Sequence, residues 1–192
     1  MFVSVRATEV VVVDRAITVV GLSLEDSGFP KQAERIGDLW GVYESEHRAN
    51  VKGVVAPLVN YGFWFGKPDG GCDYLVGSAV ADAHQADGAF ASATIPAGRY
   101  IKAAFNARDF SALVCGDGIG DSFERAKLYA SQNGLRIRQM PASPACAIEV
   151  YPHERMCVGM ANGPEWGLML REDMKTPART LYPEMYTLTP IE

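Results

Sequence analysis

The sequence contains no uninterrupted run of 18 or more apolar residues, so it predicts no membrane-spanning helix. Its first 20 residues are rich in valine, but charged residues interrupt them at Arg6, Glu9, Asp14 and Arg15. A secretory signal peptide has a basic start followed by an unbroken apolar run, and that pattern is absent. We therefore expect a cytoplasmic protein without a membrane partner.

The chain also has fewer basic than acidic residues. The chain has 18 lysines and arginines against 23 aspartates and glutamates, which gives a net charge of -5. Surfaces that bind nucleic acid are normally basic, so we predict no direct contact with nucleic acid. An acidic protein attracts cations instead.

Cysteine and histidine are few and scattered. The four cysteines form no C-x-x-C pair, and the three histidines have no H-x-x-x-H spacing. Both patterns are typical ligand sets for zinc. We predict no metal site, reduced cysteines that pack as small apolar residues, and histidines at the surface.

Motifs for catalysis are missing as well. No serine lies in a G-x-S-x-G turn. The glycine-rich segment 116–120 (GDGIG) lacks the G-x-G-x-x-G form, and we interpret it as a loop before a helix. The sequence therefore assigns no catalytic residue and no cofactor, and it favours a binding protein over an enzyme.

What the chain does contain is an ordinary globular composition, with 48% hydrophobic and 21% charged residues over 192 residues. Its first half predicts β-branched strands, then a helix with apolar residues at three- and four-residue spacing, then a hairpin. These elements span residues 4–13 and 16–22, about 30–46, and 59–65 with 72–83.

The second half repeats this order. It predicts strands over 90–95 and 99–105, a helix over about 121–133 that ends at Asn133-Gly134, and strands over 147–151 and 185–191. The pattern is a duplicated β-α-β-β unit, with pseudo-repeats at about 1–88 and 89–192. Because each unit alone buries little, we expect an α+β fold in which both units share one sheet.

The segment 147–151 (AIEVY) carries a single carboxylate in an apolar run. Strand alternation places Glu149 and Tyr151 on one face, and Ile148 and Val150 on the other. A glutamate buried without a partner is costly. Glu149 therefore lies either on a solvated strand face or in a site that uses its charge.

The strand 59–65 is rich in aromatic rings. Alternation places Tyr61, Phe63 and Phe65 on one face and Trp64 on the other. Such rings pack in cores, but aromatic walls also bind organic cations through cation–π contacts of about 0.5–2 kcal/mol each. A carboxylate among rings in an acidic protein indicates a receptor for lipophilic cations, and Trp40 in the first helix is a further candidate.

Several segments, in this order, resemble the GyrI-like superfamily, the effector-binding domains of AraC-type and MerR-type transcription regulators. They are Val19-Val20-Gly21-Leu22, Tyr61-Gly62, residues 73–80 (DYLVGSAV), residues 95–100 (IPAGRY), Glu149-Val150-Tyr151 and residues 186–191 (YTLTPI). The resemblance implies a pseudo-two-fold antiparallel sheet with two helices on one face and a ligand cleft. It also implies that Glu149 lies at the floor of an aromatic cleft and pairs with cationic drugs.

The chain departs from the family pattern in the segment 154–183, which is longer than the usual link between the last two strands. Trp166 lies in this segment. It is either a loop anchor or a lid over the cleft.

The predicted function is the binding of cationic, amphipathic small molecules by Glu149, Tyr151, Tyr61, Phe63, Trp64, Phe65, Trp40 and Trp166. Since the binding fold accounts for all 192 residues, we expect a stand-alone module without a DNA-binding domain. As a macromolecular partner we expect a separate regulator protein or a second copy of the chain. The alternatives are a small-molecule hydrolase in which Glu149 activates water, and a protein inhibitor of a partner such as DNA gyrase.

Overall fold

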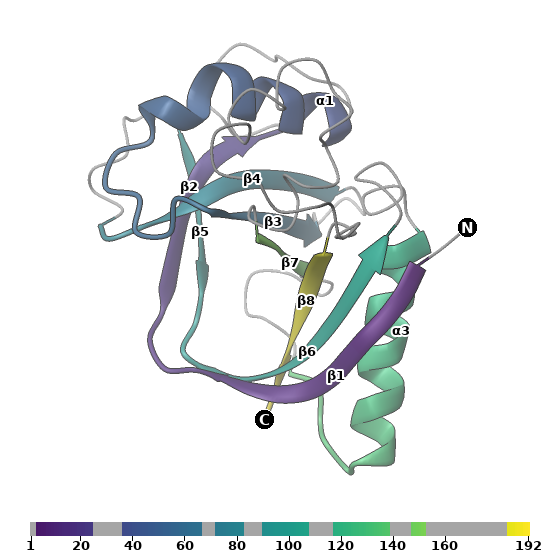
Figure 1. Ribbon diagram of the computed structural model, residues 1–192. Coiled ribbons are helices and arrows are strands. Elements are labelled where there is room, and N and C mark those ends of the chain that lie inside the picture. Colours follow the sequence, from purple (N-terminus) through teal and green to yellow (C-terminus); the bar gives the residue numbers. More distant parts are fainter. Residues whose placement is uncertain are drawn as a thin grey trace, which may run out of the picture.

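The structure is a computed structural model that describes residues 3–24, 36–66, 72–82, 90–107, 117–138, 147–152 and 184–192. Eight strands form one sheet in which every neighbouring pair is antiparallel, in the order β1-β6-β8-β7-β3-β4-β2-β5 (Figure 1). The strands are β1 (Val3–Val13), β2 (Ile17–Ser23), β3 (Val59–Gly66), β4 (Cys72–Val80), β5 (Ala91–Ile95), β6 (Gly98–Ala107), β7 (Ala147–Pro152) and β8 (Glu184–Ile191).

The two ends of this sheet are joined by a long bent ribbon. Only three residues separate β1 from β2, and only Pro96 and Ala97 separate β5 from β6. Pairing runs along both parts of the ribbon, from Val13 with Gly98 to Ile17 with Ile95. The sheet therefore curls round and encloses an inner face, as Figure 1 shows.

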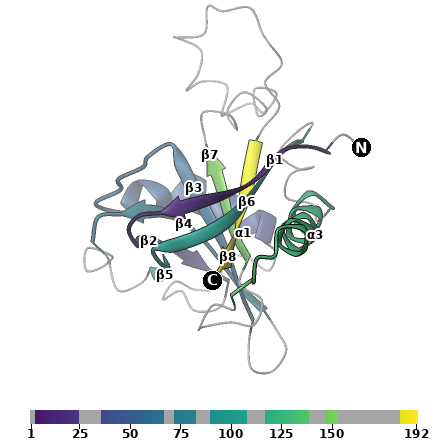
Figure 2. The ribbon, with the colours of Figure 1, turned by 90° about the horizontal axis from the view of Figure 1, so that it is seen from below.

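The sheet has the two-fold pattern that the duplicated sequence predicts. When β1 to β4 are exchanged with β5 to β8, the strand order reads the same in reverse. The pseudo-two-fold axis therefore passes between the two central strands, β3 and β7. Figure 2 shows β7 in the middle of the sheet, beside β8.

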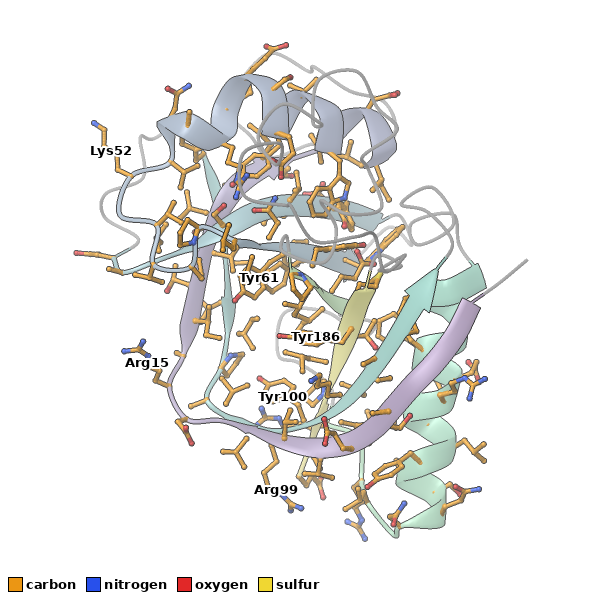
Figure 3. All side chains as sticks on the ribbon, in the orientation of Figure 1. Arg15, Lys52, Tyr61, Arg99, Tyr100 and Tyr186 are labelled. Atoms are coloured by element: carbon orange, nitrogen blue, oxygen red, sulfur yellow. The ribbon has the colours of Figure 1, made fainter. Side chains whose placement is uncertain are left out.

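Alternation along the strands separates two sets of buried residues. The inner set is almost wholly apolar and includes Tyr61, Phe63, Leu75, Ile148 and Val150. Figure 3 shows three of its tyrosines, which point from β3, β6 and β8 into the enclosed space: Tyr61, Tyr100 and Tyr186. The outer set faces the helices.

Helix α1 (Ile36–Val42) covers one part of the outer face. Its buried Leu39 and Trp40 pack with Val20, Leu22 and Val76. A π-helical turn (Tyr43–His47) and a 3-10 turn (Arg48–Asn50) extend it. The start predicted near residue 30 lies outside the described residues.

Helix α3 (Asp117–Gln132) covers the other part of the same face, where Ala126 and Ala130 pack on Ile101 and Ile191. Ile191 is on the face of β8 that also carries Thr187, the residue paired with Glu149. Both helices therefore lie on one face, as expected. Neither is long and apolar enough to cross a membrane, nor is any other helix of the described residues.

Two local predictions are wrong and one is confirmed. Residues 117–120 form the first turn of α3 rather than a loop, since glycine costs a helix only about 1 kcal/mol relative to alanine and Asp117 suits an N-terminus. His47, expected at the surface, is buried beside Phe90. At the other end of α3, Gly134 has φ +64° and Leu135 N–H donates to Ala130 O, as a glycine C-cap requires.

Candidate functional site

Glu149 occupies the middle of the outer face, on central strand β7. Its neighbours in β7, Ile148 and Val150, point inward, so alternation directs Glu149 outward between the regions covered by α1 and α3. The residue is nevertheless 0% exposed. The solvated-face interpretation of Glu149 is therefore wrong.

Three neutral donors hold the carboxylate. Trp64 Nε1 donates to Oε1 at 2.6 Å, while the hydroxyls of Tyr74 and Tyr151 each donate to Oε2 at 2.7 Å. The donors come from β3, β4 and β7. Hydrogen bonds to an ionised acceptor are short and strong, and these distances are in that range.

Helix α1 supports this arrangement through Trp40. Its Nε1 donates to the Tyr74 hydroxyl at 3.1 Å, so Tyr74 accepts from the helix and donates to the carboxylate. The Trp40 ring also meets Tyr151 edge-on, with centroids 4.7 Å apart, and Trp64 meets Tyr74 in the same way at 5.1 Å. We call Glu149, Trp64, Tyr74, Tyr151 and Trp40 the carboxylate cluster.

A glycine makes room for the carboxylate cluster. Gly62 of β3 pairs directly with Glu149 of β7, and both lie on the outer face. A Cβ added at Gly62 would lie 2.0 Å from the Tyr74 hydroxyl and 2.7 Å from Glu149 Oε2. The site therefore depends on a residue with no side chain, which explains a glycine in the middle of a central strand.

Burial sets the ionisation of the carboxylate cluster. It raises the pKa of Glu149 above its ordinary 4.5, and the hydrogen bonds from Tyr74, Tyr151 and Trp64 oppose that rise. Burial, and then the charge of Glu149, raise the pKa of both Tyr74 and Tyr151 well above 10. Both phenols therefore remain hydrogen-bond donors at neutral pH.

No lysine, arginine or histidine within the described ranges forms an ion pair with Glu149. The ion pairs found there lie elsewhere, and they are Arg48–Glu44, Lys102–Glu9, Lys127–Glu124 and Arg136–Glu192. Across the sheet from Glu149, Thr187 of β8 is also buried and donates to Ser122 of α3 at 3.1 Å.

The C-terminal end of α1 is tied to the same face by a polar chain. The Tyr43 and Ser78 hydroxyls are 2.7 Å apart, Ser78 donates to Asn60 Oδ1 at 3.1 Å, and Asn60 donates to Glu44. Burial, the largest effect, raises the pKa of Tyr43 to about 12. Because Asn60 pairs with Tyr151, this chain adjoins the carboxylate cluster and fixes α1 beside it.

Four of the predicted site residues come together: Glu149, Tyr151, Trp64 and Trp40. The other three rings of β3 do not join them, since Tyr61, Phe63 and Phe65 lie on the inner face, where Phe63 and Phe65 stack at 5.9 Å. Alternation within one strand prevents both sets of rings from bordering one carboxylate. Trp166 lies outside the described residues.

Tyr74 and Gly62 were not among the predicted site residues. The sequence contains a signal for Gly62, because a glycine inside a strand marks a close approach of another group. It contains no such signal for Tyr74, since the position of Tyr74 beside Glu149 depends on the strand order β7-β3-β4 and on the pairing of Trp64 with Tyr74. Within the described segments, no group of three or more histidine, cysteine, aspartate or glutamate side chains could hold a metal ion.

Several solved structures share this fold. No family model and no curated protein matches the sequence. The structure of SAV2435 bound to tetraphenylphosphonium aligns with a TM-score of 0.56 over 97% of this chain and 94% of that one, at 11% identity. An integron cassette protein from Vibrio cholerae aligns with a TM-score of 0.54 over 99% of both chains, at 10% identity.

The C-terminal domain of EcmrR aligns with a TM-score of 0.53 over all of this chain and 99% of that one, at 10% identity. At such identities the comparison establishes the fold. SAV2435 is a GyrI-like protein, and the EcmrR domain is an effector-binding domain. The chain therefore has the same α+β fold as these two proteins, in agreement with the resemblance of its motifs.

Proposed function

We propose that this protein binds cationic, amphipathic small molecules on the outer face of its sheet, with Glu149 as the counter-ion. The observation that carries the proposal is a wholly buried carboxylate that has three neutral donors but no cation among the described residues. Hydrogen bonds reduce the cost of burying this charge, but they do not neutralise it. A ligand cation supplies the missing charge.

The rings beside Glu149 suit the rest of such a ligand. Trp64, Tyr74, Tyr151 and Trp40 surround the carboxylate, and each ring attracts a cation placed over its face. Attraction between the ligand cation and the carboxylate is also stronger in a buried site than in water. SAV2435, a protein of the same fold, is bound to tetraphenylphosphonium, which is a lipophilic cation.

A module of this kind has a role in sensing or sequestering ligands. The matched EcmrR structures are a C-terminal domain and the longer protein in complex with DNA, of which this chain covers 57%. We propose that the present chain acts through ligand binding, with a separate regulator protein or a second copy of itself as partner, and without touching nucleic acid itself.

The direct test is isothermal titration with tetraphenylphosphonium, with tetraphenylborate, which has nearly the same shape, and with neutral triphenylphosphine oxide, which has one ring fewer. We expect a Kd near ~1 μM for the phosphonium, about -8 kcal/mol, and binding at least about tenfold weaker for the other two. Tetraphenylborate that binds as tightly as the phosphonium would show that the site does not select positive charge.

One observation favours a second function. A carboxylate with a raised pKa, oriented by neutral donors, has the properties of a general base that activates water. A hydrolase of small electrophiles would use Glu149 in this way. Hydrolysis of neutral esters or epoxides that Glu149→Gln abolishes would favour this function over binding. Cationic ligands should not be hydrolysed.

A further inference from the structure

The hydrogen bonds around Glu149 leave little room for another donor. An ionised carboxylate has about four acceptor positions, two on each oxygen. Tyr74 and Tyr151 occupy both positions on Oε2, and Trp64 occupies one on Oε1. Among the described donors, therefore, three of the four positions are filled, and one position on Oε1 remains.

The remaining position belongs to Oε1, whose described donor is the partly buried Trp64. Tyr74 and Tyr151 are 1% and 0% exposed, and their hydroxyls fill the Oε2 side in the wild type. Trp64, the partner of Oε1, is only partly buried. A ligand that reaches the carboxylate through Oε1 therefore also contacts the Trp64 ring.

We infer, on the basis of the function proposed above, that the site selects cations with no N–H group or only one: quaternary ammonium, phosphonium and protonated tertiary amines. A primary ammonium carries three N–H donors and a guanidinium carries five. Oε1 can accept one of them, and the others enter an aromatic, water-poor site. Each unsatisfied donor in such a site costs about 1–3 kcal/mol, which corresponds to roughly tenfold or more in affinity.

The experiment uses one skeleton with increasing N-methylation: 1-naphthylmethylamine and its N-methyl, N,N-dimethyl and N,N,N-trimethyl derivatives. All four are cationic at pH 7 and are titrated by calorimetry. We expect the trimethyl compound to bind at least about tenfold more tightly than the primary amine. Binding of the primary amine as tightly as the trimethyl compound would overturn the inference.

Water also binds primary ammonium strongly, so the order of affinities alone does not identify the cause. The Tyr151→Phe variant removes one donor from Oε2 and frees an acceptor position. We expect the trimethyl-to-primary affinity ratio to fall at least about threefold in this variant. Tyr100→Phe is the matched control, because it removes a buried hydroxyl that donates to Pro96 O on the inner face, and its ratio should equal that of the wild type.

An equal ratio in wild type and Tyr151→Phe would contradict the inference, because selectivity would then not depend on acceptor positions. If Tyr151→Phe does not fold, Trp64→Phe tests the same point at Oε1 on a partly buried residue. A protein that binds none of the four amines and no tetraphenylphosphonium would refute the proposed function itself. Binding of cations with an unchanged ratio would refute only the selectivity.

Discussion

The two faces of the central strand pair β3 and β7 are built from alternate residues of the same short segments, yet they differ in chemistry. On the inner face, Phe63 packs beside Ile148, and the surroundings are apolar. On the outer face, Gly62 lies beside Glu149, with tyrosine and tryptophan donors around a buried charge. One face stabilises the fold and the other presents the candidate site.

This contrast shows how the candidate site is supported. On this strand pair the inner face buries mainly apolar side chains, which adds to stability, whereas the outer face buries a charge, which costs free energy. Changes on the inner face should therefore reduce stability without changing ligand selectivity. Changes on the outer face should change ligand affinity, whatever their effect on stability.

The largest effect on stability is expected from Phe63→Ala. Phe63 is 1% exposed, and truncating a buried phenylalanine costs about 3–5 kcal/mol. Urea denaturation should show this loss, while the preference for tetraphenylphosphonium over tetraphenylborate remains in the folded fraction. A folded Phe63→Ala protein without that preference would show that the inner face takes part in the site.

Gly62→Ala should have the next largest effect. The added Cβ meets the Tyr74 hydroxyl and Glu149 Oε2, so the carboxylate cluster must shift, at a cost of about 1–3 kcal/mol in stability and at least about tenfold in cation affinity. Gly41→Ala is the matched control. Gly41 is in α1 with no atom within 4 Å of an added Cβ, so alanine there should stabilise the helix by about 0.5–1 kcal/mol. Unchanged affinity in Gly62→Ala would remove this glycine from the site.

A smaller effect concerns pH. The folded-state pKa of Glu149 is raised above 4.5, so its contribution to stability is fully present below that value and is lost as pH rises through the folded-state pKa. Cation affinity should change in the opposite sense and weaken as pH falls through the same pKa. Titrations with tetraphenylphosphonium between about pH 4 and 8 measure this. The wild-type curve should bend over this range, while Glu149→Gln should give a flat one.

Much of the fold could be predicted from the sequence, because alternation and helical spacing are local signals. The strands at 3–13 and 147–152, the glycine C-cap of α3 and the outward direction of Glu149 all follow from such signals. Trp64, Tyr151 and Trp40 were predicted as site residues because they are aromatic, and the structure brings them together with Glu149. The failures at His47 and at the first turn of α3 arose where packing or position in a helix outweighs composition.

The rest of the site depended on pairing between strands far apart in the sequence. Tyr74 reaches Glu149 across 75 residues because β4 pairs with β3 and β3 pairs with β7. Strand periodicity indicates which residues share a face, but it does not indicate which strands are neighbours. The same limit explains why Tyr61, Phe63 and Phe65 were grouped with Glu149, although they belong to the opposite face.

The central claim is that Glu149 supplies the negative charge that a bound cation needs, and Glu149→Gln tests it most directly. Glutamine keeps the shape and can still accept a hydrogen bond, but it carries no charge. We predict that affinity for tetraphenylphosphonium falls by about 1–3 kcal/mol, that affinity for neutral triphenylphosphine oxide stays the same, and that stability at neutral pH is equal or higher. A folded Glu149→Gln protein that binds the phosphonium as tightly as the wild type would contradict the account.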